Sequence, residues 1–238
     1  MDALLRRRLL MQPQGGEIVP PSNQIWYDAE SKVSLYTSIN VVSHTFSNGR
    51  GIVTFKNNLN STDLWFHNSA VTAIYLPNSI IGISNMSFSG CSKLESISLP
   101  EGLTSIGDSA FDSDLELVLN ELPIGITRVE KRVFYGCKKL NLSSLPEGLT
   151  FIGEYAFREA KLTITSLPSG VTSISQSAFY NCKGITSLTI PIVIPPTLGS
   201  AVFYNTSFPI YVPAESLNTY KAATNWSSWK SRIFAIPE

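Results

Sequence analysis

Hydrophobic and polar positions recur with a fixed period along most of the chain. A Leu-Pro or Ile-Pro pair begins at residues 76, 99, 122, 145, 167 and 190, in steps of 22 or 23 residues. A phenylalanine keeps nearly the same period, at Phe88, Phe111, Phe134, Phe157, Phe179 and Phe203. Self-similarity at roughly 20 to 29 residues is typical of a leucine-rich-repeat solenoid, in which each coil covers the apolar face of the next.

One period indicates which elements to expect. Ile97 and Leu99 alternate with serines, which is the pattern of a half-buried strand. Pro100 lacks a backbone N–H and ends that strand. Ala110-Phe111 suits a short helical turn whose ring fills the coil centre. We therefore expect a right-handed α/β-type superhelix of mostly short parallel strands and short helical turns, with the phenylalanines stacked about 4.7–4.9 Å apart in a central spine.

The strand pattern has two versions. Residues 94–99 read Leu-x-x-Ile-x-Leu, whereas residues 117–122 and the two coils that follow read Leu-x-Leu-x-x-Leu or its equivalent. Moving one apolar residue by one place would turn the side chains of a regular strand over. The shift therefore predicts a bulge or kink before the proline in the three middle coils.

The ends of the chain depart from the repeat. We expect an N-terminal arm and linker at 1–23, a strand-rich cap with a degenerate first coil at 24–70, repeats at 71–209 and a helical C-terminal cap at 210–238. Asn48-Gly49 between two apolar runs predicts a β-hairpin in the first cap. Trp226 and Trp229 suit a plug over the last coil, or alternatively an aromatic platform for a sugar or peptide.

Residues 1–12 combine leucines with Arg6, Arg7 and Arg8. An isolated helix of this length is marginal in water. Two interpretations stay open: a frayed or partner-docked terminus, or an arm that docks on a membrane or a particle.

The repeat resembles a known family. Leu-Pro-Glu-Gly-Leu-Thr-Ser-Ile-Gly-Asp-Ser-Ala-Phe at 99–111, with a close copy at 145–157, is similar to the BspA-type leucine-rich repeat of bacterial surface antigens. The segment at 211–221 resembles that family's closing segment, so the likeness covers roughly residues 60 to 236. The resemblance implies adhesion to host or partner proteins and a cell-surface or extracellular location, with no shared catalytic residues.

Composition narrows the partners. Eighteen basic and 18 acidic residues give a formal net charge of zero, so no long-range field attracts nucleic acid. No apolar run is long enough for a transmembrane segment. The first residues lack the apolar core of a signal peptide and have no nearby cysteine for a lipid anchor, so the expected location depends on the resemblance alone.

No constellation for catalysis or metal binding is evident. Cys91, Cys137 and Cys182 lie two coils apart, about 10 Å by strand spacing, which is beyond the Cα separation of about 7 Å that a disulfide allows. We expect three buried free thiols. The two histidines, His44 and His67, lack partners at metal-ligand spacing. We expect no enzyme activity, no cofactor and no metal.

The outward residues of the first strand in each coil remain as the candidate surface. They are mainly hydroxyl-bearing, and Tyr75 is their one aromatic residue. The candidate partner-binding residues are Tyr75, Ser96, Ser98, Asn120, Asn141, Thr165 and Thr189. Solenoid faces commonly bind partners, although a solvated face without a ligand is the alternative.

Two functions follow from this surface and the resemblance. The first is a non-catalytic interaction protein that binds a protein or glycan partner, as an adhesin does, through a solenoid face. The second is a structural spacer or assembly component, of a virion or appendage type, that is docked by its N-terminal arm.

Overall fold

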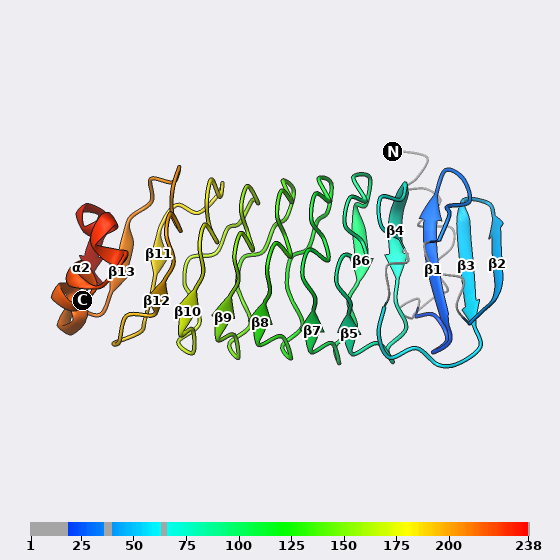
Figure 1. Cartoon of the computed structure of the whole chain (residues 1–238), viewed down its shortest axis with the longest axis horizontal. Coiled ribbons are helices and arrows are strands. Elements are labelled where there is room, and N and C mark those ends of the chain that lie inside the picture. Colours follow the sequence, from blue (N-terminus) through cyan, green and yellow to red (C-terminus); the bar gives the residue numbers. More distant parts are fainter. Residues whose placement is uncertain (1–18, 36–39, 63–65, 238) are drawn as a thin grey trace.

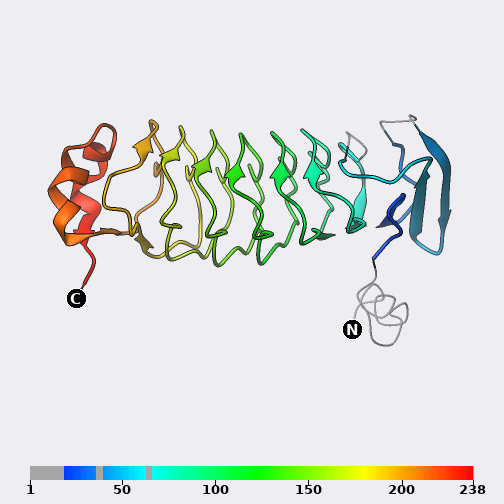
Figure 2. The same cartoon turned by 90° about the horizontal axis from the view of Figure 1, so that it is seen from below.

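The structure is a computed structural model that describes residues 19–35, 40–62 and 66–237. The chain winds into coils that stack in single file along the long axis (Figure 1). Antiparallel strands stand at one end of the stack and the helix α2 (Leu217–Ala222) at the other, as the view from below also shows (Figure 2). The arm and linker expected at 1–23 lie mostly outside the described residues.

The N-terminal end is a sheet that continues into the first coil. Strands β1 (Gln24–Ala29), β2 (Val41–Ser47) and β3 (Arg50–Phe55) are antiparallel, and β1 also pairs with β4 (Val71–Tyr75). β4 pairs in parallel with β6 (Ser96–Ser98). Asn48 and Gly49 join β2 to β3 with φ of 52° and 83°, as the predicted hairpin requires.

Two rows of short parallel strands run along the stack. The first row continues after β6 with β11 (Leu188–Thr189), β13 (Ile210–Val212) and β14 (Ile233–Ala235). The second consists of β5 (Gly82–Ile83), β7 (Ser105–Ile106), β8 (Arg128–Val129), β9 (Phe151–Ile152), β10 (Ser173–Ile174) and β12 (Thr197–Leu198). Between β6 and β11 the first row is reduced to isolated bridges such as Leu142 with Leu162, which confirms the kink that the one-residue shift predicts.

A phenylalanine spine fills the centre. Successive rings from Phe66 to Phe203 are buried and stacked, with centroids 5.4–6.2 Å apart. Phe111 and Phe134 lie 5.6 Å apart with an interplanar angle of 1°. The predicted spine is confirmed, although its ring centroids are further apart than the expected strand spacing of about 4.7–4.9 Å. Phe66 extends the spine by one coil.

The sequence led us to expect a short helical turn around each spine phenylalanine. In the described repeats this segment is instead a run of non-helical turns. The residues two before and two after the phenylalanine have positive φ, for example Arg132 (56°) and Gly136 (71°) around Phe134. This alternation aims backbone N–H groups along the stack, so that the Phe134 N–H donates to the Ala156 carbonyl of the next coil (2.9 Å). Inter-coil bonds offset the cost of left-handed backbone at non-glycine residues.

The C-terminal end closes the spine. After the short helix η1 (Ala214–Ser216) and α2, the helix η2 (Trp226–Arg232) places two tryptophans over the last coil. The rings of Trp226 and Trp229 lie 6.0 and 5.9 Å from Phe203. The buried Trp226 indole donates to the Pro196 carbonyl (2.8 Å). These tryptophans plug the stack.

The three thiols are free and buried, as predicted. Each donates to the carbonyl of the spine phenylalanine in the preceding coil, at 2.8–3.1 Å: Cys91 to Phe66, Cys137 to Phe111, and Cys182 to Phe157. Burial raises the pKa of Cys91 to about 12. Asp114 occupies the equivalent position in the coil between Cys91 and Cys137.

Candidate functional site

The predicted candidates Tyr75, Ser96 and Ser98 lie together in β4 and β6, where Tyr75 is the strand partner of Ser98. The Tyr75 hydroxyl donates to Asp28 Oδ2 (2.9 Å), and its ring lies 4.6 Å from the Arg50 guanidinium. Ser98 Oγ accepts the N–H of Leu76 (2.9 Å). Tyr75 and Ser98 therefore help to join the cap to the first coils.

The remaining predicted candidates form two separate pairs. Asn141 Nδ2 donates to Asn120 Oδ1 (3.3 Å), and both side chains are exposed on the kinked coils. The Thr189 N–H donates to the Thr165 carbonyl (2.8 Å), with Thr165 exposed and Thr189 half-buried. The structure thus distributes the seven candidates over three small clusters on the first-strand side.

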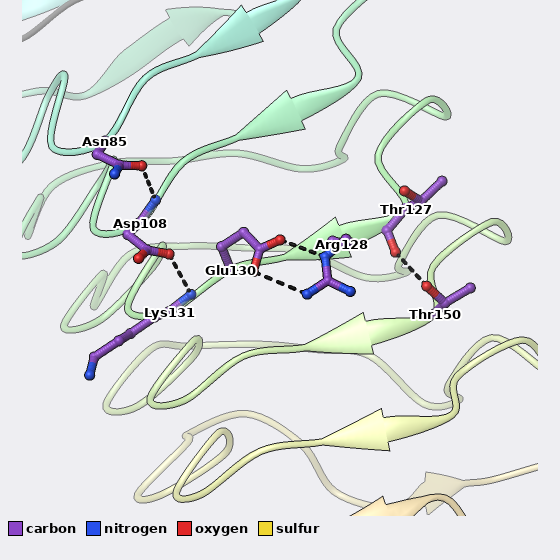
Figure 3. Close-up of polar contacts among 7 residues, drawn as sticks. All are labelled: Asn85, Asp108, Thr127, Arg128, Glu130, Lys131 and Thr150. Atoms are coloured by element: carbon purple, nitrogen blue, oxygen red, sulfur yellow. Dashed lines mark hydrogen bonds and ion pairs between the residues drawn. The ribbon is translucent and has the colours of Figure 1, made fainter.

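Polar side chains on the second-strand side bond mostly to one another and to the backbone (Figure 3). The Thr150 hydroxyl donates to the Thr127 carbonyl (3.1 Å). Asn85 Oδ1 accepts the Asp108 N–H (2.8 Å), and Asp108 Oδ1 accepts the Lys131 N–H (3.2 Å) one coil further on. These ladders tie successive coils together.

A column of tyrosine and arginine side chains follows the turns beside the spine. Tyr135, Arg158, Tyr180 and Tyr204 each stand directly after a spine phenylalanine in four successive coils. The Arg158 guanidinium lies 5.6 Å from the Tyr135 ring and 4.4 Å from the Tyr180 ring. The Tyr180 and Tyr204 rings are stacked at 5.2 Å. The four side chains form one continuous stack on the surface.

Residues two before the phenylalanine widen this column. Arg132 lies 4.1 Å from the Tyr135 ring, and Tyr155 lies 5.5 Å from the Arg158 guanidinium. We call Arg132, Tyr135, Tyr155, Arg158, Tyr180 and Tyr204 the tyrosine–arginine ridge.

One ridge residue is exposed, the other five are half-buried, and both arginines are paired with acidic side chains. The Tyr204 side chain is 53 % exposed, and that of Arg158 is 30 % exposed. Arg132 pairs with Asp112 (2.8 Å), whose hydrogen bond raises the Arg132 pKa, and Arg158 pairs with Glu159 (3.3 Å). Sequence reasoning missed the ridge because it followed the strands. The signal was the residue after each spine phenylalanine from Phe88 onward, which reads Ser, Asp, Tyr, Arg, Tyr, Tyr along the repeats.

A groove of about 560 Å³ lies on the first-strand side at the start of the kinked coils. Ile97 and Leu99 of one coil and Val118 and Leu122 of the next provide its apolar lining, and Asn120 lies at its wall. Among the candidates predicted from the sequence, Asn120 is the one that lines this groove.

Within the described ranges, no set of three or more His, Cys, Asp or Glu side chains is placed to hold a metal ion. His44 is hydrogen-bonded through Nε2 to the Tyr27 hydroxyl (2.8 Å), and burial lowers the pKa of its imidazole. No helix in the part of the chain that the structure covers is long and apolar enough to cross a membrane.

The stacked coils, parallel strands and phenylalanine spine define a leucine-rich-repeat protein. The family model of the BspA type leucine-rich repeat region matches in six copies, over residues 31–141, 60–186 and 110–227. The chain belongs to this family, which confirms the resemblance seen in the sequence. No curated protein matches the chain.

Two solved structures are similar. A leucine-rich cell surface protein from Faecalibacterium prausnitzii is 22 % identical with a TM-score of 0.54, over 79 % of this chain and 49 % of its own. This chain therefore spans about half the length of that protein. A leucine-rich repeat protein from Bacteroides ovatus is 20 % identical with a TM-score of 0.37, over 73 % of this chain and 63 % of its own. At these identities the first likeness concerns the fold alone, and the second has too low a TM-score to add to it.

Proposed function

We propose that the protein is a non-catalytic interaction module that binds a protein partner through the tyrosine–arginine ridge. The observation that carries this proposal is the surface stack of Tyr135, Arg158, Tyr180 and Tyr204, of which the first three are half-buried and the last is exposed. Tyrosine and arginine are among the residues that dominate binding energy at protein interfaces. The first-strand side instead presents serine, threonine and asparagine, which contribute less.

The ridge is also pre-organised. Arg158 is held between two tyrosine rings and by Glu159, and Tyr155 Oη accepts a hydrogen bond from Gln176 (3.2 Å). Side chains that are ordered before binding lose less conformational entropy on association. The rigid spine beneath them fixes their spacing. Adhesion at a cell surface is the role that fits this family best.

The experiment is a binding screen with matched variants of the full chain. The immobilised protein is presented with a panel of extracellular matrix proteins and with a glycan array. Any hit is then measured against a ridge variant, Tyr180→Ser with Tyr204→Ser, and a first-strand variant, Asn141→Ala with Thr165→Ala. We expect a protein hit whose affinity falls about thirtyfold or more in the ridge variant, as loss of a hot spot of about 2 kcal/mol requires, and little change in the first-strand variant.

Each other outcome has a defined meaning. Thermal unfolding of both variants separates lost binding from lost folding. A loss confined to the Asn141 and Thr165 variant would transfer the site to the predicted first-strand side. Glycan hits alone would replace the protein partner, and a uniformly negative screen would favour the structural spacer or assembly component.

A further inference from the structure

The groove on the first-strand side exists because the apolar pattern changes there. Leu117 and Leu119 both point inward, so Val118 between them stands outward and is 42 % exposed. The kinked coil no longer pairs as a strand with β6, although the Val118 N–H still donates to the Glu95 carbonyl (3.1 Å). Val118 and Ile124, which is 82 % exposed, line a trough between the two coils that has both apolar and polar walls. Its volume of about 560 Å³ is within the range of ligand-binding clefts.

Two carboxylates border this trough. Glu101 and Glu121 both line the groove and are exposed. Neither forms an ion pair with any described residue, whereas the neighbouring Glu116 pairs with Lys139. Apolar side chains together with two unpaired carboxylates fit a peptide that carries leucines next to arginines.

The N-terminal part of the described chain contacts the stack of coils one coil before the groove. Ser79 Oγ donates to the Ser22 carbonyl (3.3 Å), and the Ser22 hydroxyl donates to Asn58 Oδ1 (2.8 Å). Ser79 follows Leu76 by three places, as Gly102 follows Leu99 beside the groove. One or two coil spacings, about 5–10 Å, separate these positions. Residues 13–18, which precede the described chain, span up to about 20 Å when extended, which exceeds these coil spacings and lets residues 1–12 reach the groove.

We propose that this groove is the docking site for residues 1–12 of the same chain. Leu4, Leu5, Leu9 and Leu10 supply apolar side chains for the apolar lining, and the run Arg6–Arg8 supplies cations for Glu101 and Glu121. Binding of this arm covers the exposed Val118 and Ile124. The proposal does not depend on the tyrosine–arginine ridge, which is built from the turns beside the spine.

A photo-crosslinking experiment on the full chain tests the docking. Ile124 is replaced by benzoylphenylalanine, a change its exposure accommodates, and the crosslinked peptides are mapped by mass spectrometry. We expect crosslinks from position 124 to residues 1–12 within one chain. Glu101→Gln with Glu121→Gln should lower their yield about threefold or more, because each exposed ion pair contributes modestly.

A matched control is available in the next repeats. Glu147 follows Leu145-Pro146 as Glu101 follows Leu99-Pro100, and it does not line the groove. Glu147→Gln should leave the yield unchanged. A second measurement uses a labelled synthetic peptide of residues 1–12 and, as acceptor, the full chain with Arg6, Arg7 and Arg8 replaced by serine. Its Kd should rise about three- to tenfold with the Glu101 and Glu121 changes.

Several results would overturn the docking. Crosslinks only to residues outside 1–12, crosslinks that join two copies, or a yield insensitive to both glutamates would each contradict it. A labelled peptide that binds equally well to the doubly substituted acceptor would do so as well. None of these results bears on whether a partner binds the ridge.

Discussion

Replacement of Asp114 by cysteine should stabilise the protein. Asp114 is fully buried, and neither carboxyl oxygen has a hydrogen-bond partner among the described residues. The nearby Cys91 N–H, which favours the charged carboxylate, already donates to the Phe88 carbonyl (3.1 Å). Burial, and to a smaller extent Asp112, therefore raises the pKa of Asp114 well above its usual range.

The size of the gain in stability follows from the residues that occupy the position of Asp114 in the neighbouring coils. The thiols of Cys91 and Cys137 each donate to the spine carbonyl of the preceding coil, and a cysteine at 114 has the Phe88 carbonyl in the same place. An unsatisfied buried polar group costs about 1–3 kcal/mol. Asp114→Cys should raise the free energy of unfolding by about that amount at neutral pH, or the Tm by about 2–12 °C for a chain of this length.

The pH dependence gives the sign of the effect. With a raised native pKa, the folded state binds more protons than the unfolded state at pH values above the unfolded aspartate pKa of about 3.9. The contribution of the Asp114 carboxyl to the free energy of unfolding of the wild type is therefore largest below about pH 4. It falls as the pH rises towards the native pKa. The difference in free energy of unfolding between Asp114→Cys and the wild type should therefore grow as the pH rises through that range.

Urea unfolding followed by tryptophan fluorescence, at about pH 4 and at about pH 7, measures both effects. Asp114→Asn serves as the control, because it removes the titration but keeps a polar group in the same place. It should flatten the pH dependence and stabilise less than cysteine. A destabilised Asp114→Cys protein, or a pH profile unchanged by either substitution, would refute a buried and unpartnered carboxyl.

Three further predictions concern the scaffold. A Cβ at Gly51 would lie 1.9 Å from Tyr27 Cζ, so Gly51→Ala should lower the free energy of unfolding, measured by chemical denaturation, by about 1–3 kcal/mol. Gly102→Ala is the control and should change it little, because a Cβ at Gly102 would have nothing within 4 Å. Phe134→Ala removes a ring stacked on both sides and should lower the unfolding free energy by about 3–5 kcal/mol in the same assay. Burial and a Cys91 pKa of about 12 should leave the thiols unreactive to a thiol reagent until denaturant is added, and rapid native labelling would contradict that.

Much of the scaffold could be predicted from the sequence because it repeats. The period positions each spine phenylalanine against its copies, and the same ladder separates Cys91 from Cys137 by two coils. Even the kink before Leu122 follows from a local change in pattern, since the inward alternation of a strand cannot survive a one-residue shift.

The candidate surfaces were harder to predict because they depend on neighbours that are distant in sequence. The contact of Tyr75 with Asp28 and Arg50 requires β1 to lie between β3 and β4, and nothing near Tyr75 in the sequence indicates that order. The ridge depends on turns whose outward residues follow no hydrophobic period. Stacking of Arg158 against Tyr180 emerges only when the coils are placed in register.

Spacing between coils is the most direct test of the account, because spine, ridge and groove all depend on it. Ser61, Ser105 and Thr197 are exposed and stand in one column of the second strand row, with Ser105 four coils and Ser61 six coils from Thr197. Spin labels on Ser61→Cys with Thr197→Cys, and on Ser105→Cys with Thr197→Cys, report the two separations by double electron–electron resonance. The first pair should be about 10 Å further apart than the second, two strand spacings. Equal separations, or a shorter distance from position 61, would contradict stacked coils.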